Sequence, residues 1–431
     1  MVTTAVLVPA DVGLVVPGPF GTLQPVTSRQ VFPEQNLSDG SVQTLTYRSR
    51  HVFEEDTPFV ILVYANSAEP AGYAVDTVTY KAGYDYVPAA SVGGSLNSIA
   101  CYGVTFRGAA SMSLLPGSFG ASDPIFGPFK KGDVLLVRTN VAVDTLGKKW
   151  PIGMTLNWGY EGTASGDQTT TPNFSISFTP AGSGVSPTAI LGPVNGRPCV
   201  VALGDSIPDG AGDTGTGSEP TNNNGFISRA CWGKYGLVKL CFPGRRVAQE
   251  VASAAYRQRG PLAMLGKNAI CEYATNDIGN GDSLATIQAN LIAFWNLYSN
   301  TGRRLFQTTI VPRTTSTDSW ATVANQTVRS GESVRLALNT WLRAGAPMAA
   351  GVAVAVGTAG ALVAGNAGHP LCAIFDVAAA VEVNASNVLT LNGGFWITTG
   401  AANYPTADGI HPSRATSILM SAAVDDTKFT A

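Results

Sequence analysis

The chain has 431 residues, enough for two or three domains, and 45% of them are hydrophobic, so a sizeable core is possible. Only 13% are charged, and the net charge of −2 comes without a basic stripe, which argues against nucleic-acid partners and anionic membranes. The 48 glycines and the low charge are more typical of a β-rich extracellular or virion protein than of a cytosolic enzyme.

The first half of the chain predicts extended and β structure. Residues 1–40 are rich in proline, and we expect them to run along a surface or to contact another chain. Residues 41–185 predict an all-β, sandwich-like accessory domain, because runs of β-branched and aromatic residues alternate with turn residues and show no helical periodicity. The predicted strands cover 42–53, 59–65, 73–80, 100–106, 133–141 and 174–178.

A change of pattern separates this half from the rest. Residues 180–187 are small and turn-forming, which is typical of a flexible linker, and we place the linker proper at 186–196. Beyond it, apolar strands alternate with amphipathic segments over 197–431, which predicts an α/β domain with a parallel sheet, helices on both faces and a core of its own. The strands are expected at 199–203, 237–242, 269–273, 305–311 and 371–377, and the helices at 226–235, 247–257, 283–298 and 333–343.

A candidate site residue follows each of three of these strands, at the point where the strand ends. Ser206 closes a Gly-Asp-Ser triplet directly after 199–203, Gly244 follows 237–242, and Asn276 follows 269–273. Catalytic groups of a parallel sheet gather at the carboxyl ends of its strands, so these three residues are expected to share one site.

A serine nucleophile needs an adjacent base, and the base needs a group that fixes its orientation. The sequence holds only three histidines, and one of them, His411, lies three positions after Asp408, so that one loop supplies both groups. His51 lies in what we expect to be an exposed strand edge, and His369 precedes a proline in a glycine-rich loop. Both are interpreted as structural or solvated.

The Gly-Asp-Ser triplet, the turn at Gly244, the segment with Asn276 and the Asp408–His411 pair follow one another along the chain. In this order they resemble the four sequence blocks of the SGNH hydrolases, also called GDSL-type esterases. The resemblance covers about residues 197–431 and implies the flavodoxin-like parallel sheet of that family. It implies that Ser206 is the nucleophile, His411 the base and Asp408 the orienting acid. The oxyanion hole would be formed by Ser206, Gly244 and Asn276.

Several positions leave alternatives open. Ala274 stands where the third block of the family has glycine, and we expect Asn276 to keep its place. Asp376 is a rival for the triad acid, although the corresponding residue of the family is structural. Trp396 either stacks on a sugar or belongs to the core. The glycine-rich loop 207–225 is either a mobile lid or a calcium site that would use its carboxylates.

The resemblance implies a serine esterase that removes a small acyl group, with acetyl favoured. Carbohydrate is the expected substrate class, because a β-rich domain is added and the composition is poor in charge. A lipase or lysophospholipase is the alternative, but it would need an apolar groove or an amphipathic lid helix, and neither pattern is found. No cofactor and no metal are expected.

A second hypothesis is a phage virion or tail appendage, or a receptor-binding protein, that contains this esterase domain. Residues 1–185 would then serve homo-oligomerisation or virion assembly. The N-terminus lacks the basic region of a signal peptide, and no segment reaches the ~20 apolar residues of a membrane helix. We therefore expect an extracellular or virion-associated protein, with its six cysteines mostly free.

Overall fold

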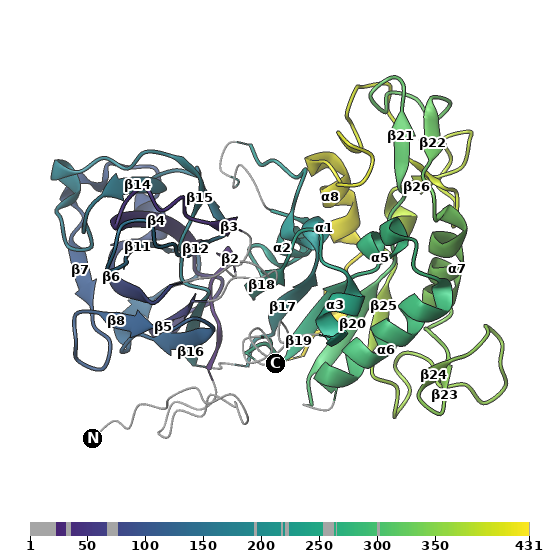
Figure 1. Cartoon of the computed structure of the whole chain (residues 1–431), viewed down its shortest axis with the longest axis horizontal. Helices are drawn as coiled ribbons and strands as arrows, with labels where there is room; N and C mark the ends of the chain where they lie inside the picture. The colour runs from purple at the N-terminus through teal and green to yellow at the C-terminus, as the bar shows by residue number, and fades with distance from the viewer. Residues whose placement is uncertain are drawn as a thin grey trace.

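The computed structural model describes residues 23–31, 36–66, 76–193, 196–216, 219, 224–252, 263, 265–299 and 302–430. These residues form a β-rich N-terminal part and an α/β C-terminal part that lie side by side (Figure 1). The predicted extended segment 1–40 falls largely outside the described residues.

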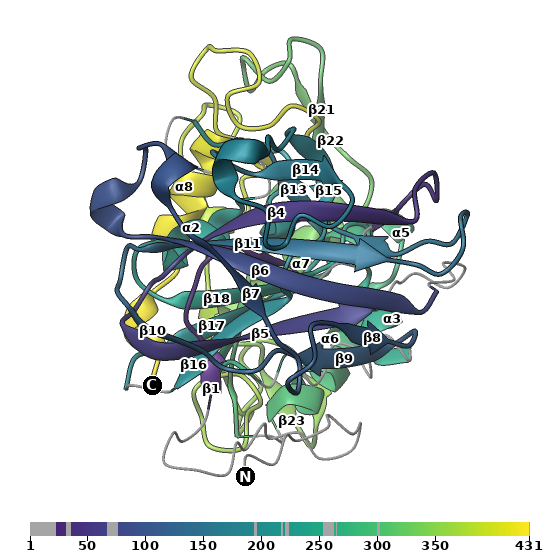
Figure 2. The same ribbon diagram turned by 90° about the vertical axis from the view of Figure 1, so that its left-hand side faces the viewer.

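Two large antiparallel sheets form most of the N-terminal part, and two small two-stranded sheets accompany them among the described residues. The first contains β1 (Leu23–Pro25), β16 (Ala189–Pro193), β5 (Thr57–Asn66) and β10 (Ile125–Phe129), with β9 (Ser118–Ala121) also paired to β5. The second contains β14 (Gly162–Ser165), β4 (Thr44–Val52), β11 (Val134–Ala142), β6 (Val78–Val87) and β7 (Cys101–Val104), with β8 (Met112–Leu114) on β6. Figure 2 looks onto the second sheet.

One apolar cluster lies between these sheets. Leu62 and Tyr64 of β5 contact the same buried cluster as Leu135 and Val137 of β11. β11 is an interior strand, paired with β4 on one side and with β6 on the other, and its side chains are buried along almost the whole strand. The two sheets therefore pack face to face.

Several sequence predictions for this part need correction. Residues 174–178 do not form a strand, because Asn173–Ser175 is a single 3₁₀ turn. His51 is not at an exposed edge but fully buried on β4, where it pairs with Leu135 of β11, and burial lowers the pKa of its imidazole to about 3. Residues 180–196 are not a simple linker, because β15 (Ala181–Gly184) pairs with β13 (Met154–Leu156), and β16 pairs with β5.

The C-terminal part is built on a parallel sheet whose strand order is β2-β18-β17-β19-β20-β25. Its strands match the five predicted ones closely and are β17 (Cys199–Gly204), β18 (Gly236–Cys241), β19 (Asn268–Glu272), β20 (Arg304–Thr308) and β25 (Ala373–Phe375). Strand β2 (Gln30–Val31) belongs to the N-terminal segment and extends this sheet beyond β18.

Helices cover both faces of this sheet, as the alternating pattern predicts. One apolar cluster joins one face to α3 (Val247–Ala252), α6 (Leu284–Ser299) and α7 (Glu332–Arg343). Another cluster joins the opposite face to α2 (Phe226–Cys231) and α8 (Arg414–Ala422). The predicted helix 247–257 runs into residues that the structure does not describe.

The two parts share buried surface. Phe59, Ile61 and Val63 on β5 lie in the same apolar cluster as Val201 and Val238 of the parallel sheet. Together with the β2–β18 pairing, this contact joins the two parts through a continuous core.

The cysteines agree with the expectation of free thiols. All six are free, and Cys199, Cys231, Cys241 and Cys271 are buried. Among the described residues, no helix combines the length and the apolar character that a membrane crossing requires.

Candidate active site

The nucleophile candidate lies where β17 turns into a short helix. Gly204 ends the strand at a close approach, since a Cβ atom there would lie 2.4 Å from the carbonyl oxygen of Glu272. Asp205 then caps α1 (Ser206–Asp209) by accepting a hydrogen bond from the N–H of Ile207 at 2.9 Å. Ser206 is therefore the first residue of the helix, with its hydroxyl at the carboxyl edge of the sheet.

The structure brings Ser206, His411 and Asp408 together in one chain of hydrogen bonds. The Ser206 Oγ lies 2.7 Å from the Nε2 atom of His411, and the Nδ1 atom of His411 lies 2.6 Å from the Oδ2 atom of Asp408. The other oxygen of Asp408 accepts the backbone N–H groups of Ile410 and His411 at 2.8 and 2.9 Å. This is the arrangement in which a histidine can take a proton from a serine.

Electrostatics favour a charged imidazole at this position. Burial of His411 opposes protonation, but the hydrogen bond and charge of Asp408, helped by the charge of Asp205, outweigh burial and raise the pKa of His411 above its ordinary value. Burial also opposes ionisation of Asp408, yet its hydrogen bonds from His411 and Ile410 hold the pKa of Asp408 well below its usual range. The imidazolium that forms during proton transfer is therefore stabilised.

Glycine at position 409 shapes the loop that holds this pair. Gly409 has φ of 81°, and a Cβ atom there would lie 1.9 Å from the carbonyl oxygen of Thr314. The Nε1–H of Trp396 donates to the carbonyl oxygen of Gly409 at 3.2 Å, and Arg329 donates to that of Asp408 at 2.8 Å. Trp396 is fully buried, so it belongs to the core and is not a sugar platform.

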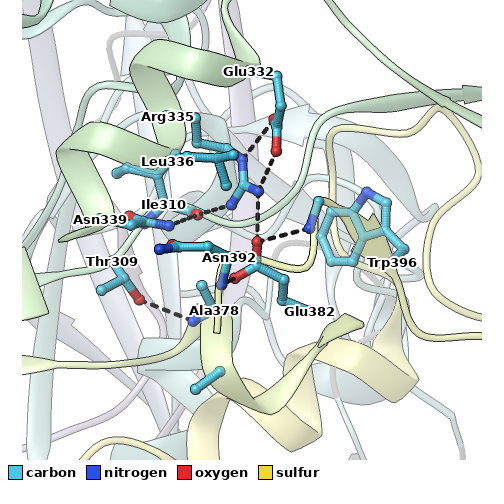
Figure 3. Close-up of polar contacts among 12 residues, drawn as sticks. Thr309, Ile310, Glu332, Arg335, Leu336, Asn339, Ala378, Glu382, Asn392 and Trp396 are labelled. Carbon is cyan, nitrogen blue, oxygen red and sulfur yellow. Dashed lines mark hydrogen bonds and ion pairs between the residues drawn. The ribbon is translucent and has the colours of Figure 1, made fainter. Parts of the chain in front are cut away.

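A buried polar cluster supports the segment from which Trp396 projects (Figure 3). Arg335 on α7 forms ion pairs of 2.6 Å with both Glu332 and Glu382, and Glu382 accepts the backbone N–H of Gly394 at 3.1 Å. Next to it, Asp376 pairs with Arg343 at 2.8 Å. The rival acid Asp376 is therefore engaged with an arginine, while the contact to His411 is made by Asp408.

The predicted oxyanion donors lie at the same sheet edge. The Nδ2 atom of Asn276 donates to Asp205 at 2.8 Å and to the carbonyl oxygen of Arg245 at 3.1 Å. The second contact anchors the turn that contains Gly244, whose φ is 78° and whose surroundings are open. Because both N–H groups of Asn276 have protein acceptors, an oxyanion would have to replace the longer bond to Arg245.

The alanine that departs from the family pattern has an unusual backbone. Ala274 is fully buried, with φ of 112° and ψ of −17°. L-residues other than glycine adopt such positive φ values only at a cost in conformational energy. The residue precedes α5 (Thr275–Asn280), and Asn276 still lies on the first turn of that helix, as the sequence predicts.

Sequence reasoning missed a carboxyl pair directly behind the nucleophile. The side chains of Asp205 and Glu272 are buried and hydrogen-bonded to each other, which requires a proton between them. Burial, and then the negative charge of Asp205, raise the pKa of Glu272 well above its ordinary value. Since Asp205 also accepts from Asn276, this pair fixes the amide next to Ser206. The sequence marks Glu272 only as an acidic residue at the end of an apolar strand, which does not reveal its contact with Asp205.

Three carboxylates in the described residues of the loop after Ser206 lie close to cations. Asp213 forms a 2.6 Å pair with Arg229, Glu219 pairs with Arg414 at 2.8 Å, and Asp209 lies 3.9 Å from the ammonium of Lys239. These carboxylates thus have cationic partners of their own. Among the described residues, no group of acidic, histidine or cysteine side chains is arranged to hold a metal ion.

Comparisons with known proteins give matches at the level of structure. Neither a protein-family model nor a curated protein matches the sequence. A GDSL-like lipase from Bacteroides thetaiotaomicron is 13% identical, with a TM-score of 0.31 over 53% of this chain and 86% of that chain. A catalytic mutant of an acetylxylan esterase from Geobacillus stearothermophilus is 13% identical, with a TM-score of 0.32 over 55% and 95%.

A third match reaches further along this chain. A protein from Bacillus subtilis is 10% identical, with a TM-score of 0.34, and the match covers 87% of this chain and 78% of that chain. The family that the four motifs resemble is thus also named among the structural matches. TM-scores below 0.5 say nothing about activity, so the activity is inferred from the contacts of Ser206, His411 and Asp408.

Proposed function

We propose that the protein is a serine ester hydrolase of the SGNH type and that it removes a small acyl group, with acetyl favoured, from a carbohydrate. The observation that supports this most directly is the hydrogen-bonded chain from Ser206 through His411 to Asp408. Five strands of the parallel sheet belong to the C-terminal part. Their order, β18-β17-β19-β20-β25, agrees with the flavodoxin-like order 2-1-3-4-5 and supports the same assignment.

The proposed reaction has two halves. Ser206 Oγ attacks the ester carbonyl carbon while its proton moves to His411 Nε2, and the resulting oxyanion is held by the N–H groups of Ser206 and Gly244 and by the amide of Asn276. The intermediate then expels the alcohol oxygen, which takes the proton from His411. Water repeats the sequence on the acyl-enzyme and releases the carboxylic acid.

The N-terminal part is proposed to be a β-sandwich-like accessory domain. Its two sheets pack face to face around a shared apolar cluster, which supports this assignment. Its role in attachment, in oligomerisation or in virion assembly is a prediction from composition, and so is an extracellular or virion-associated location. Light scattering on the purified protein would distinguish a monomeric enzyme from an assembled one.

An acyl-chain-length series of p-nitrophenyl esters tests the substrate class, together with acetate release from acetylated polysaccharides. We expect the highest kcat/KM for acetyl and a steep fall with chain length. A rise toward long acyl chains would favour the lipase alternative.

A further inference from the structure

An open groove lies in the N-terminal part, and none of its lining residues belongs to the α/β part. Its volume is about 460 Å³, within the range of ligand sites, and it is lined by polar side chains such as those of Arg48, Asn97, Asn157 and Ser177. A second cavity of about 290 Å³ shares Asn97 and Asn173 with the first. We call the two together the Arg48 trough, an elongated site that suits an oligomeric ligand.

The Arg48 side chain is a buried cation at the floor of this trough. It is only 6% exposed, and its guanidinium stacks on the ring of Phe178 at 4.0 Å. Its Nε–H donates to the carbonyl oxygen of Tyr160, and its Nη1 atom donates to Asn173 at 3.3 Å. Within the part of the chain that the structure describes, Nη2 has no acceptor and is available to a ligand.

Positive charge exceeds negative charge among the side chains around the trough. The carboxylates that act on the arginines of this cluster are Asp85, paired with Arg138, and Glu161, paired with Arg29. Among the described residues, neither Arg48 nor Arg50 has an ion pair with a carboxylate, and desolvation lowers the pKa of both guanidinium groups despite the charges of Asp85 and Glu161.

Arg50 is a second, half-buried cation near the trough, and the carboxylate that acts on it, Glu161, is already paired with Arg29. The Arg50 guanidinium lies over the ring of Trp158 at 3.9 Å, and its Nε atom is buried without a hydrogen-bond acceptor among the described residues. A buried cation without a counter-charge is costly, and a bound anion would lower that cost.

Backbone strain points to the same place. Tyr160 lines the trough and has φ of 72°, a left-handed conformation that is unfavourable for a bulky residue. Its carbonyl oxygen is held by Arg48, and its hydroxyl donates to the carbonyl oxygen of Gly94. Such strain is retained mainly where a site requires it.

We infer that the Arg48 trough binds an acidic oligosaccharide, with the carboxylate of a uronic acid unit against the Arg48 guanidinium. The Nη2 atom of Arg48 can donate a charge-assisted hydrogen bond to a carboxylate. The amide and hydroxyl groups of Asn97, Asn157 and Ser177 suit sugar hydroxyls, and the ring of Tyr160 suits a sugar face. The inference deepens the proposed function, since it names an acidic polymer as the carbohydrate, but it does not depend on hydrolysis.

Calorimetric titration of the full-length Ser206→Ala protein tests the inference, because this background removes hydrolysis from the measurement. The probes are trigalacturonate and trimannuronate, each compared with its methyl ester, which keeps the sugar chain, removes the charge and adds one methyl group per unit. We expect one of the acids to bind at least ~10-fold more tightly than its ester, about 1.4 kcal/mol. Binding of neither acid in preference to its ester would overturn the inference.

Three variants locate the site. Ser177→Trp, which fills the trough from an exposed position, should abolish binding, and Arg48→Gln should remove the preference for the acid over the ester. Lys148→Gln removes a surface cation of the same part and should change nothing. Unaltered binding by Ser177→Trp would refute the site even if Arg48→Gln failed to fold.

Turnover of p-nitrophenyl acetate by the protein with intact Ser206 is measured in parallel. Because no trough residue belongs to the proposed catalytic machinery, Ser177→Trp should leave this turnover unchanged. Binding without turnover would contradict the proposed esterase alone, whereas turnover without binding would contradict the trough alone.

Discussion

At the scale of single residues, the bond between Asp408 and His411 decides at which pH Ser206 can react. His411 must be neutral to accept the serine proton, and Asp408 raises the pKa of His411. We therefore expect kcat/KM to rise with pH through a value above the ordinary histidine pKa of 6.5. Asp408→Asn should shift this limb to lower pH and lower the maximum rate, as a pH profile of p-nitrophenyl acetate hydrolysis would show.

Asp376→Asn is the matched control for this experiment, since it also removes one carboxylate, but one that pairs with Arg343. Its pH limb should stay where the unmodified protein has it. An equal shift in both variants, with both folded, would mean that Asp408 has no special role.

The carboxyl pair behind Ser206 makes a second prediction, about stability. The pKa of Glu272 is higher in the folded protein than in the unfolded chain, so its contribution to stability is present at low pH and is lost as pH rises through the folded value. Glu272→Gln mimics the protonated acid. Urea unfolding at a series of pH values rising from the ordinary glutamate pKa of 4.5 should show a fall in the free energy of unfolding for the unmodified protein, and a smaller fall for Glu272→Gln. Parallel curves would rule out a proton between Glu272 and Asp205.

The residues of the site differ in how well the sequence identifies them. Ser206, His411 and Asp408 could be identified because few histidines compete and the motif order is specific. Glu272 could not, since its partner Asp205 directly follows the neighbouring strand β17, and only the register of β17 and β19, which pairs Gly204 with Glu272, brings them together.

At the scale of elements, the strained turn between β19 and α5 offers a third prediction. Glycine at position 274 would remove an unfavourable φ that costs roughly 1–3 kcal/mol, but it would add freedom to the unfolded chain worth about 0.4–1 kcal/mol. Ala274→Gly should therefore raise the free energy of unfolding by about 1 kcal/mol and keep esterase activity. Denaturant unfolding measures this directly, and a loss of stability would show that the turn is not strained.

Elements of the α/β part could be predicted because each apolar run is bounded by turn residues and is long enough to span the sheet. Elements whose sequence patterns are weak could not be predicted. The segment Ala181–Gly184 has the composition of a linker, yet it is a strand because β13 offers it a partner. His51 shows the same limit, since it is covered by β11 on one side of β4 and by residues 27–28 on the other, a contact between distant segments.

At the scale of the whole molecule, the shared core makes a fourth prediction. Removing residues before Gly192 would expose Val201 and Val238 to water and would take β2 from the edge of the parallel sheet. We expect such a fragment to unfold at a lower temperature than the full chain or to aggregate, and the full chain to unfold in one transition. Calorimetry with size-exclusion chromatography tests both expectations. Two independent transitions in the full chain would contradict the joint core.

The sequence indicates two parts, but it does not predict the contact between β5 and the parallel sheet. The apolar residues of β5 are equally compatible with the interior of either part. The same strand faces the β-rich cluster with Leu62 and the α/β cluster with Ile61 and Val63. A pattern of alternation cannot say that both faces of one strand are buried by different parts of the molecule.

The central claim is that Ser206 performs ester hydrolysis with His411 as its base. The most direct test compares p-nitrophenyl acetate turnover of the unmodified protein with that of Ser206→Ala, after circular dichroism has shown that both are folded. We predict clear turnover by the first and none above background by the second, because the variant lacks only the attacking oxygen. Equal turnover by the two proteins would contradict the account.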